Sequence, residues 1–481
     1  LPYRKQSVVA RAAYGYDNRY MLEGSFGATG SENFASGHRW GIFPAVGAAW
    51  YVSHEKFMEP LENTLSKLKL RASFGITGND EIGSSSRFPY RESLSTGGTG
   101  YNMGLTPGVN GDVTGGSGAG IIEQDFATPN LTWERERKIN IGADLGFFKG
   151  SVDLIVDWFA NRRNNILLRR KTIPSAAGFR NSPWQNFGVT TNKGIDASLV
   201  FKQQIGKVFM SVRGNLTYAK NKVEEYDEVP QVYQYQAYTG QSIGQPLVYV
   251  AEGLYTPDDF DIVENANGSK TYTLKDGMPN PGTQVAPGDI KYKDLNGDKK
   301  IDSLDKTYEN GLYPEDPRLV YGFGLNLEWK GFFAGVFFQG VGQTSVNLLA
   351  SAGNFMPFHN GVDASSARME ALNRWQNDDP YNQNVLFPRV HATKFDNNTY
   401  GSTWWYRNGS FLRLKNVEFG YQFNKQMLRK ISMQNLRIYV QGTNLAVWDN
   451  IKYWDPELGG SNSGSKYPIC GTWTMGLEVT F

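Results

Sequence analysis

The chain has 481 residues, a net charge of +2 and a charged fraction of 20%, so nothing in its charge suggests nucleic-acid binding. Its single cysteine, Cys470, excludes an intrachain disulfide and any multi-cysteine metal site. No apolar run reaches the roughly 18 residues of a transmembrane helix, but the aromatic fraction of 14% suits the interfacial girdles of a membrane β-barrel.

Segments in which apolar and polar residues alternate recur along the whole chain and predict β-strands. In residues 67–77 the apolar set is Leu68, Leu70, Ala72, Phe74 and Ile76, against Lys67, Lys69, Arg71, Ser73 and Thr77. We expect about thirteen strands, at 7–16, 20–29, 42–51, 66–77, 138–147, 151–162, 193–203, 207–219, 319–329, 332–342, 410–423, 436–445 and 471–481. Several have about the 9–11 residues that a tilted strand needs to cross a bilayer. A change of phase between Leu414 and Val417 predicts a β-bulge.

The connections between these strands alternate in length. Short or moderate ones lie at 17–19, 52–65, 148–150, 204–206, 330–331 and 424–435, and long ones at 78–137, 163–192, 220–318, 343–409 and 446–470. Outer-membrane barrels have short periplasmic turns and long extracellular loops, whereas a β-sandwich has no reason to segregate its loops. The sequence therefore predicts an all-β, transmembrane antiparallel β-barrel.

The directions of the first and last predicted strands indicate whether the sequence contains all the strands of a barrel. If 17–19 is a periplasmic turn, strands 7–16 and 471–481 both run inward, yet single-chain bacterial barrels have an even number of strands with both ends in the periplasm. We therefore expect an odd number of strands to precede Leu1. On this interpretation residues 1–481 are the C-terminal portion of a single barrel domain, and both terminal strands pair with residues outside this sequence.

Several segments resemble the SusC-like TonB-dependent outer-membrane transporters of Bacteroidota. They are "RWGIFPAVGAAWYVSHEKF" (39–57), "NLTWERERKINIGADLGFFKGSVDLIVDWFANRRNNIL" (130–167), "NKGIDASLVFK" (192–202), "DLNGDKKIDSLDK" (294–306), "DPRLVYGFGLNLEWKGFFAGVFFQGVGQ" (316–343) and "YRNGSFLRLKNVEFGYQF" (406–423). The resemblance implies a plugged barrel of about 22 strands, a SusD-like surface lipoprotein that acts as a lid, and energy supplied through TonB. The plug, the TonB-contacting segment and the first strands of that family are absent from this sequence.

The most specific local motif is "DLNGDKKIDSLD" (294–305). Asp294, Asn296, Asp298, Lys300, Asp302 and Asp305 occupy positions 1, 3, 5, 7, 9 and 12 of a loop like that of an EF-hand, which binds Ca²⁺ through oxygen ligands. Position 6 is Lys299 rather than Gly, and position 12 is Asp rather than Glu. The motif therefore predicts either a structural Ca²⁺ site or an acidic turn held by Asx hydrogen bonds.

Catalytic motifs find little support, because the four histidines are scattered and none has a metal-ligand spacing; we expect no enzyme. The long loops carry aromatic residues on which sugar rings could stack, and which could equally be girdle or packing residues. These candidate ligand-binding residues are Trp184, Tyr233, Tyr235, Tyr238, Trp404 and Trp405.

Taken together, the residues and the resemblance predict active import of oligomeric nutrients, foremost glycans, through a barrel in contact with outer-membrane lipid. Three alternatives stay open: an oligopeptide importer of the same family, a passive porin, and a barrel that serves as a scaffold in a larger outer-membrane assembly.

Overall fold

The computed structural model describes residues 4–81, 88–98, 102–107, 113–117, 120–349, 355–363, 365–428, 432–460, 464 and 466–481. The chain divides into two compact units. The first comprises Leu1–Asp196 and Lys220–Pro230, and the second Ala197–Ala219 and Gln231–Phe481. Two long strands contribute residues to both units, and the expectation of a single domain stays a prediction.

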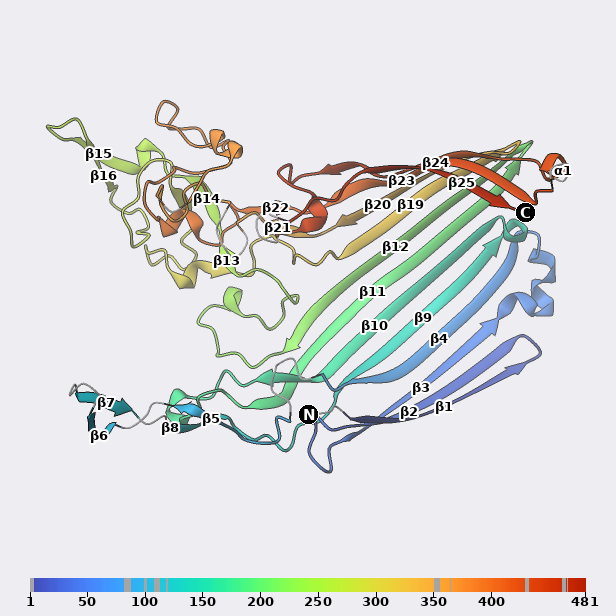
Figure 1. Cartoon of the computed structure of the whole chain (residues 1–481), viewed down its shortest axis with the longest axis horizontal. Coiled ribbons are helices and arrows are strands. Elements are labelled where there is room, and N and C mark those ends of the chain that lie inside the picture. The colour runs from blue at the N-terminus through green and yellow to red at the C-terminus, as the bar shows by residue number, and fades with distance from the viewer. Residues whose placement is uncertain are drawn as a thin grey trace. The chain divides into compact units, whose positions relative to one another are not determined.

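A 13-stranded antiparallel sheet dominates the structure and confirms each predicted strand (Figure 1). Its strands are β1 (Lys5–Tyr16), β2 (Tyr20–Ser31), β3 (Trp40–Tyr51), β4 (Leu65–Asn79), β9 (Glu134–Phe147), β10 (Val152–Arg169), β11 (Trp184–Ile205), β12 (Val208–Glu225), β19 (Leu319–Trp329), β20 (Phe332–Gly342), β23 (Phe411–Gln422), β24 (Asn435–Asp449) and β25 (Thr472–Thr480). Each strand lies beside its neighbour in this order. β1 and β25 stand at the two ends of the order, so the expectation that they pair with residues outside the sequence stays a prediction.

The register of the first unit places the predicted apolar residues on one face. Tyr14 lies opposite Leu22, Leu22 opposite Ala48, Ala48 opposite Ala72, and Ala72 opposite Ile141. Successive side chains of a strand alternate between faces, so this register aligns all the apolar positions. The row is exposed, with Tyr14 at 67% and Ile141 at 53% of full exposure, which is the arrangement that a lipid-facing surface requires.

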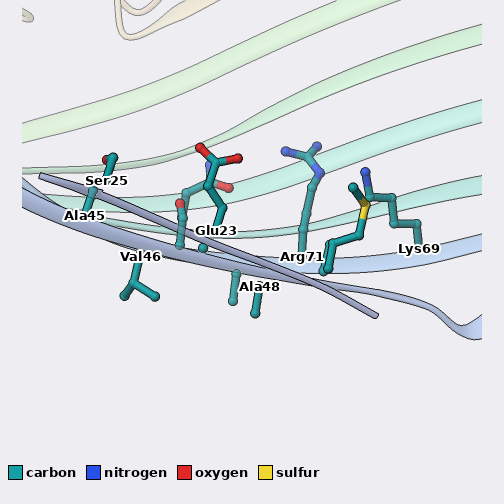
Figure 2. A pocket seen from close by; sticks show the side chains of 13 residues that line it. Glu23, Ser25, Ala45, Val46, Ala48, Lys69 and Arg71 are labelled. Atoms are coloured by element: carbon teal, nitrogen blue, oxygen red, sulfur yellow. The ribbon is translucent and has the colours of Figure 1, made fainter. Parts of the chain in front are cut away.

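The opposite face of the same strands is polar. The Arg71 guanidinium on β4 contacts Asp144 of β9 at 3.0 Å and Asp157 of β10 at 2.7 Å. Figure 2 shows Arg71 and Lys69 on the same side of the sheet, while Val46 points to the other side. Lys69 and Arg71 line a hollow of about 350 Å³. The predicted assignment of Lys69 and Arg71 to the polar face is therefore confirmed.

Connections within each unit follow the predicted length pattern. The two-residue centre of the first hairpin, Asp17 and Asn18, has φ values of 52° and 51°, as tight hairpin turns require and as Asp and Asn tolerate. The single α-helix in the described residues, α1 (Lys425–Leu428), lies in one of the short-end connections. No helix in the described part of the chain is long and apolar enough to span a membrane.

Three strands extend well past their predicted ends on the long-loop side. β10 continues to Arg169, β11 begins at Trp184, and β12 continues to Glu225. These extensions contain polar segments such as "NRRNN" (161–165) and "TTNK" (190–193), in which apolar and polar residues do not alternate. Strand pairing with a neighbour, rather than local patterning, therefore keeps them extended.

The predicted bulge in the 410–423 strand is confirmed at Lys415. Leu414 and Asn416 of β23 pair with Phe338 and Phe337 of β20, so Lys415 has no partner there. The register with β24 is also interrupted between Leu414 and Asn416. The extra residue explains the change of phase in the sequence.

Small two-stranded sheets occupy the long loops, for which the sequence predicts no strands. They pair β5 (Ser93–Gly98) with β8 (Gly120–Asp125), β6 (Asn102–Pro107) with β7 (Val113–Ser117), β13 (Val248–Tyr249) with β18 (Lys306–Thr307), β14 (Ala251–Leu254) with β17 (Ile290–Tyr292), β15 (Phe260–Glu264) with β16 (Lys270–Leu274), and β21 (Ser345–Asn347) with β22 (Tyr406–Asn408). Short 3₁₀ helices lie at Val52–His54, Lys56–Leu61, Phe148–Gly150, Ser175–Ala177, Gln234–Gln236, Pro257–Asp259, Ser303–Asp305, Met369–Leu372, Asp396–Thr399 and Pro456–Leu458.

Candidate functional site

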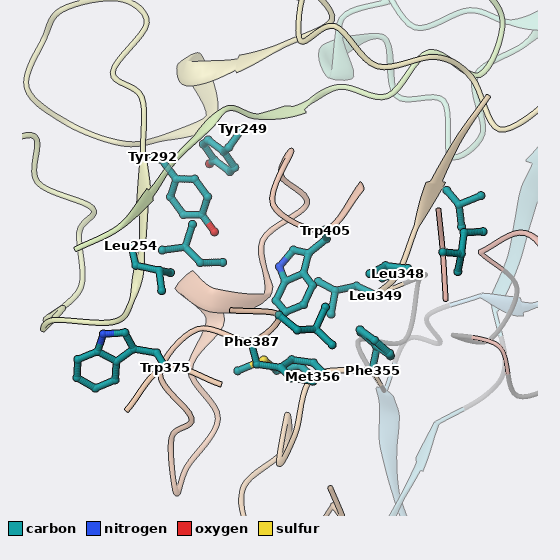
Figure 3. Close-up of a cluster of buried hydrophobic side chains, with 14 of the residues drawn as sticks. Tyr249, Leu254, Tyr292, Leu348, Leu349, Phe355, Met356, Trp375, Phe387 and Trp405 are labelled. Atoms are coloured by element: carbon teal, nitrogen blue, oxygen red, sulfur yellow. The ribbon is translucent and has the colours of Figure 1, made fainter. Parts of the chain in front are cut away.

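Three long loops of the second unit fold together around a hydrophobic core. We call the described residues within 231–318, 343–410 and 450–471 the loop cluster. The core takes Tyr292 from the first loop, Phe387 and Trp405 from the second, and Ile451 from the third. Figure 3 shows Tyr292, Phe387 and Trp405 among its members. Because this core is made of side chains from separate loops, the cluster is a folded body that can hold surface residues in fixed positions.

A buried carboxylate joins two of these loops. Asp289, which is fully buried, accepts hydrogen bonds from the Arg389 guanidinium at 3.1 and 2.7 Å and from the Asn398 amide at 2.9 Å. The His391 ring lies 2.7 Å from the same carboxylate, and the backbone N–H of Ala286 donates to it at 2.9 Å. Partners of this kind compensate the cost of burying the charge.

A further set of polar contacts connects the loop cluster to the sheet. The buried Arg413 guanidinium of β23 contacts Asp455 at 2.5 Å and Glu457 at 2.7 Å, both in the 450–471 loop. The backbone N–H of Gly460 donates to Glu315 at 2.8 Å. The Arg413 contacts therefore connect the 450–471 loop to β23 of the sheet, and the Gly460 contact joins two loops of the cluster.

One polar hollow of about 350 Å³ opens in the loop cluster. Its lining includes Glu252, Gln383, Trp404 and Arg407. The Trp404 indole N–H donates to the carbonyl of Leu386 at 3.2 Å, which fixes the half-buried ring. Sequence reasoning singled out Trp404 in this group and missed the other three, although the Gly that follows Glu252 in a strand is a signal for a bulge.

The structure places the other predicted ligand-binding residues differently. Trp405 is fully buried in the core of the loop cluster, and its indole N–H donates to the carbonyl of Asn398 at 3.1 Å. Of the two roles that the sequence allows for Trp405, ligand stacking and packing, its complete burial supports packing. Trp184 is half-buried in the first unit, where the Arg169 guanidinium lies 4.7 Å from the centre of its ring.

The three predicted tyrosines line the 3₁₀ turn at 234–236. Tyr233 stacks on Tyr235 with ring centres 5.1 Å apart, and Tyr238 packs against Tyr308 at 5.5 Å. The Tyr235 hydroxyl donates to the carbonyl of Leu304 at 2.8 Å. All three are half-buried. The contacts of Tyr235 and Tyr238 with residues 304–308, and the stacking of Tyr233 on Tyr235, give them a packing role.

The acidic loop at 294–305 holds itself together through its own carboxylates. Asp294 accepts hydrogen bonds from the backbone N–H groups of Gly297 at 2.7 Å and Lys299 at 2.9 Å, and Asp305 accepts from Leu295 at 2.8 Å. Burial raises the pKa of Asp305. The described residues include no group of three or more His, Cys, Asp or Glu side chains placed to hold a metal ion.

The remaining predicted metal residues take part in the same turns. Asn296 accepts from the N–H of Asp298 at 3.0 Å, Asp298 from that of Lys300 at 2.8 Å, and Asp302 from that of Leu304 at 2.8 Å. Lys299, at position 6, has a φ of 63°, the left-handed conformation that the usual Gly allows.

Ionisable groups of the loops have their pKa values shifted by identifiable causes. Burial raises the pKa of Tyr249 to about 12, so this phenol stays protonated. Burial also opposes ionisation of Asp227, but hydrogen bonds from the N–H groups of Lys171 and Thr172 and from the Thr172 hydroxyl lower its pKa to about 2. The charged Asp227 thereby holds the 170–183 loop to the end of β12 in the first unit.

The sheet, its alternating faces and its segregated loops define a membrane β-barrel protein of the outer membrane. A sequence model described as "TonB dependent receptor-like, beta-barrel" matches residues 5–445, and the chain belongs to this family. Members of the family are transporters and not enzymes. The predicted family, fold class and location are therefore confirmed.

Individual relatives agree with this assignment. The chain is 28% identical to TonB-dependent receptor P3 of Formosa agariphila over 99% of its own length and 45% of that protein. It is 25% identical to TonB-dependent receptor SusC of Bacteroides thetaiotaomicron over 99% of its own length and 43% of that protein. The solved structure of the RagAB peptide transporter superposes with a TM-score of 0.72 at 22% identity, over 100% of this chain and 48% of that one. The chain thus spans a little under half the length of these relatives.

Proposed function

We propose that the whole protein to which this chain belongs imports oligomeric nutrients, foremost glycans, across the outer membrane at the expense of energy supplied through TonB. The observation that carries the proposal is the loop cluster, a folded body with a polar hollow on a family-typical membrane sheet. A passive pore needs no such body. Membership of the TonB-dependent receptor family argues in the same direction.

We also propose two protein partners. A SusD-like lipoprotein would close over the loops as a lid, in keeping with the likeness to SusC, and TonB would act through parts of the protein outside this sequence. Exposed apolar residues of the loop cluster, such as Val232 at 78% and Met369 at 79% of full exposure, offer contact surface for a partner.

An oligopeptide importer is the second candidate, and one observation favours it: the fold is shared with the RagAB peptide transporter. Binding measurements with the intact protein, purified with any lipoprotein that accompanies it, separate the two. We expect binding of neutral oligosaccharides from starch, cellulose, mannan or xylan, and none of a tryptic digest of casein. Binding of the digest alone would replace the glycan proposal by the peptide alternative, and binding of neither would contradict nutrient import.

A structural Ca²⁺ in the 294–305 loop is proposed as well. Its support is the alternate placement of oxygen-bearing residues together with the left-handed Lys299. Elemental analysis of native protein should find calcium, and Asp298→Ala should lower the calcium content without unfolding the sheet. Equal calcium in the two proteins, or none in either, would leave the loop as a turn held by its hydrogen bonds.

A further inference from the structure

The hollow in the loop cluster brings together a carboxylate, a guanidinium and an indole. Glu252 follows the first residue of β14, Trp404 lies just before β22, and Arg407 lies in β22. We propose that this hollow is a subsite for one pyranose residue of an oligosaccharide, with the sugar ring packed on Trp404 and its hydroxyls bonded to Glu252 and Arg407. The inference rests on the glycan import proposed above.

The first argument for the subsite is the environment of the Arg407 guanidinium. Its guanidinium donates to the carbonyls of Trp404 at 2.6 Å and Tyr406 at 3.0 Å, and within the described residues it makes no ion pair with a carboxylate. The side chain is half-buried, and burial lowers its pKa. A partly desolvated cation without a counter-ion gains from an added acceptor, and its two carbonyl bonds come from one nitrogen, which leaves other N–H groups for a ligand.

The second argument for the subsite is that a β-bulge in the backbone sets the direction of the Glu252 side chain. Ala251 pairs with Tyr292 and Gly253 with Lys291, so Glu252 is the extra residue of a β-bulge. Gly253 has a φ of 136°, and a Cβ there would lie 2.7 Å from the Gln383 amide oxygen. Bulges re-aim a side chain at the cost of a ladder pair. Here the re-aimed carboxylate is exposed and lines the hollow without an ion-pair partner among the described residues.

Backbone groups around the hollow already make hydrogen bonds within the protein, which favours a sugar over a peptide as the ligand. The N–H of Ala251 donates to the Thr403 hydroxyl at 2.9 Å, and Gln383 bonds both the N–H and the carbonyl of Leu254. A peptide that binds by strand addition needs free backbone groups at a sheet edge. A sugar instead offers hydroxyls, which donate to a carboxylate and accept from a guanidinium, and an apolar ring face for the indole.

Equilibrium binding to the intact protein tests the subsite, with the oligosaccharide of the above panel that binds best. Glu252→Gln and Trp404→Ala should each weaken binding about tenfold or more, as expected for loss of a charge-assisted hydrogen bond or of an aromatic contact. Glu264→Gln, which removes an exposed carboxylate of β15, is the matched control and should bind like the unaltered protein. Within the described residues the Glu252 side chain makes no hydrogen bond, so its substitution should keep the fold even if that of Trp404 loosens the core.

The outcomes separate this subsite from the proposed function. If oligosaccharide binding is intact in both variants, the subsite is wrong and glycan import stands. If the unaltered protein binds only the casein digest, glycan import falls and the subsite falls with it. A loss of peptide binding in Glu252→Gln would make the hollow a peptide subsite and would also overturn the proposal.

Discussion

The membrane sheet and the loop cluster of the second unit use apolar side chains in opposite ways. Phe323 of β19 is 44% exposed on the face of the sheet, whereas Phe387 of the loop cluster is fully buried. The solvent explains the difference: hydrocarbon accepts an exposed phenyl ring, and water does not. Within one chain, therefore, whether an apolar side chain is buried or exposed depends on the medium that surrounds that part of the chain.

Charged groups show the same contrast between the sheet of the first unit and the contact of the loop cluster with β23 in the second unit. Arg71 and Arg413 each contact two carboxylates, but the Arg71 side chain is 32% exposed and that of Arg413 only 3%. Water can replace a lost partner at the first site and has little access to the second. The two groups of ion pairs should therefore contribute differently to the free energy of unfolding, with the larger contribution at Arg413.

The largest expected effect is that of Phe387→Ala, which should destabilise the loop cluster by about 3–5 kcal/mol because it leaves a cavity in a packed core. Phe323→Ala is the matched control and should cost less, since lipid chains can fill the space. Hydrogen exchange of residues 231–318 and 365–410 measures the difference. Equal protection in the two variants would mean that the loop cluster has no core of its own.

Removal of the buried guanidinium comes next. Arg413→Gln should cost about 3 kcal/mol, because it leaves the Asp455 carboxylate, whose side chain is only 9% exposed, without its counter-charge. Glu457 is more exposed, and Lys415 stays 3.6 Å from it. Arg71→Gln should cost less than about 1 kcal/mol. Urea titration in lipid vesicles gives both values, and a larger loss for Arg71 would reverse the comparison.

A charge on the apolar face tests the register of the sheet. Phe74→Arg should cost about 2–3 kcal/mol near the middle of the bilayer, whereas Ser73→Arg, one residue away on the polar face, should cost little. The free energy of unfolding in vesicles is the measurement. The faces are assigned wrongly if Ser73→Arg has the larger effect.

The smallest effect is expected at Asp227, whose pKa falls from a usual 3.8 to about 2. A depressed carboxyl pKa stabilises the folded state above the unfolded value, so this contribution is complete above about pH 4 and is lost as pH falls toward 2. Cleavage of the 170–183 loop by pepsin should rise over that interval. In Asp227→Asn, which loses about 1–2 kcal/mol at neutral pH, the cleavage should be high throughout, and a pH response like that of the unaltered protein would exclude Asp227 as its cause.

The strands, their two faces and the distribution of loop lengths could all be predicted from local patterns in the sequence. A period of two is a local property of the chain, so Leu70 and Arg71 fall on opposite faces of β4 wherever that strand pairs. Even the bulge at Lys415 left a change of phase that could be read. The family could also be recognised from the sequence, because the segments that resemble it keep the family's order along the chain.

The roles of residues in the long loops, in contrast, follow from the three-dimensional packing and could not be predicted from local patterns. Trp404 and Trp405 are neighbours of the same type, yet the first lines the hollow and the second is buried in the core. Glu252 and Arg407 come from different loops, and no local pattern predicts that they line one hollow. Their positions depend on packing among segments distant in sequence, which is set by the complementary shapes of many side chains together.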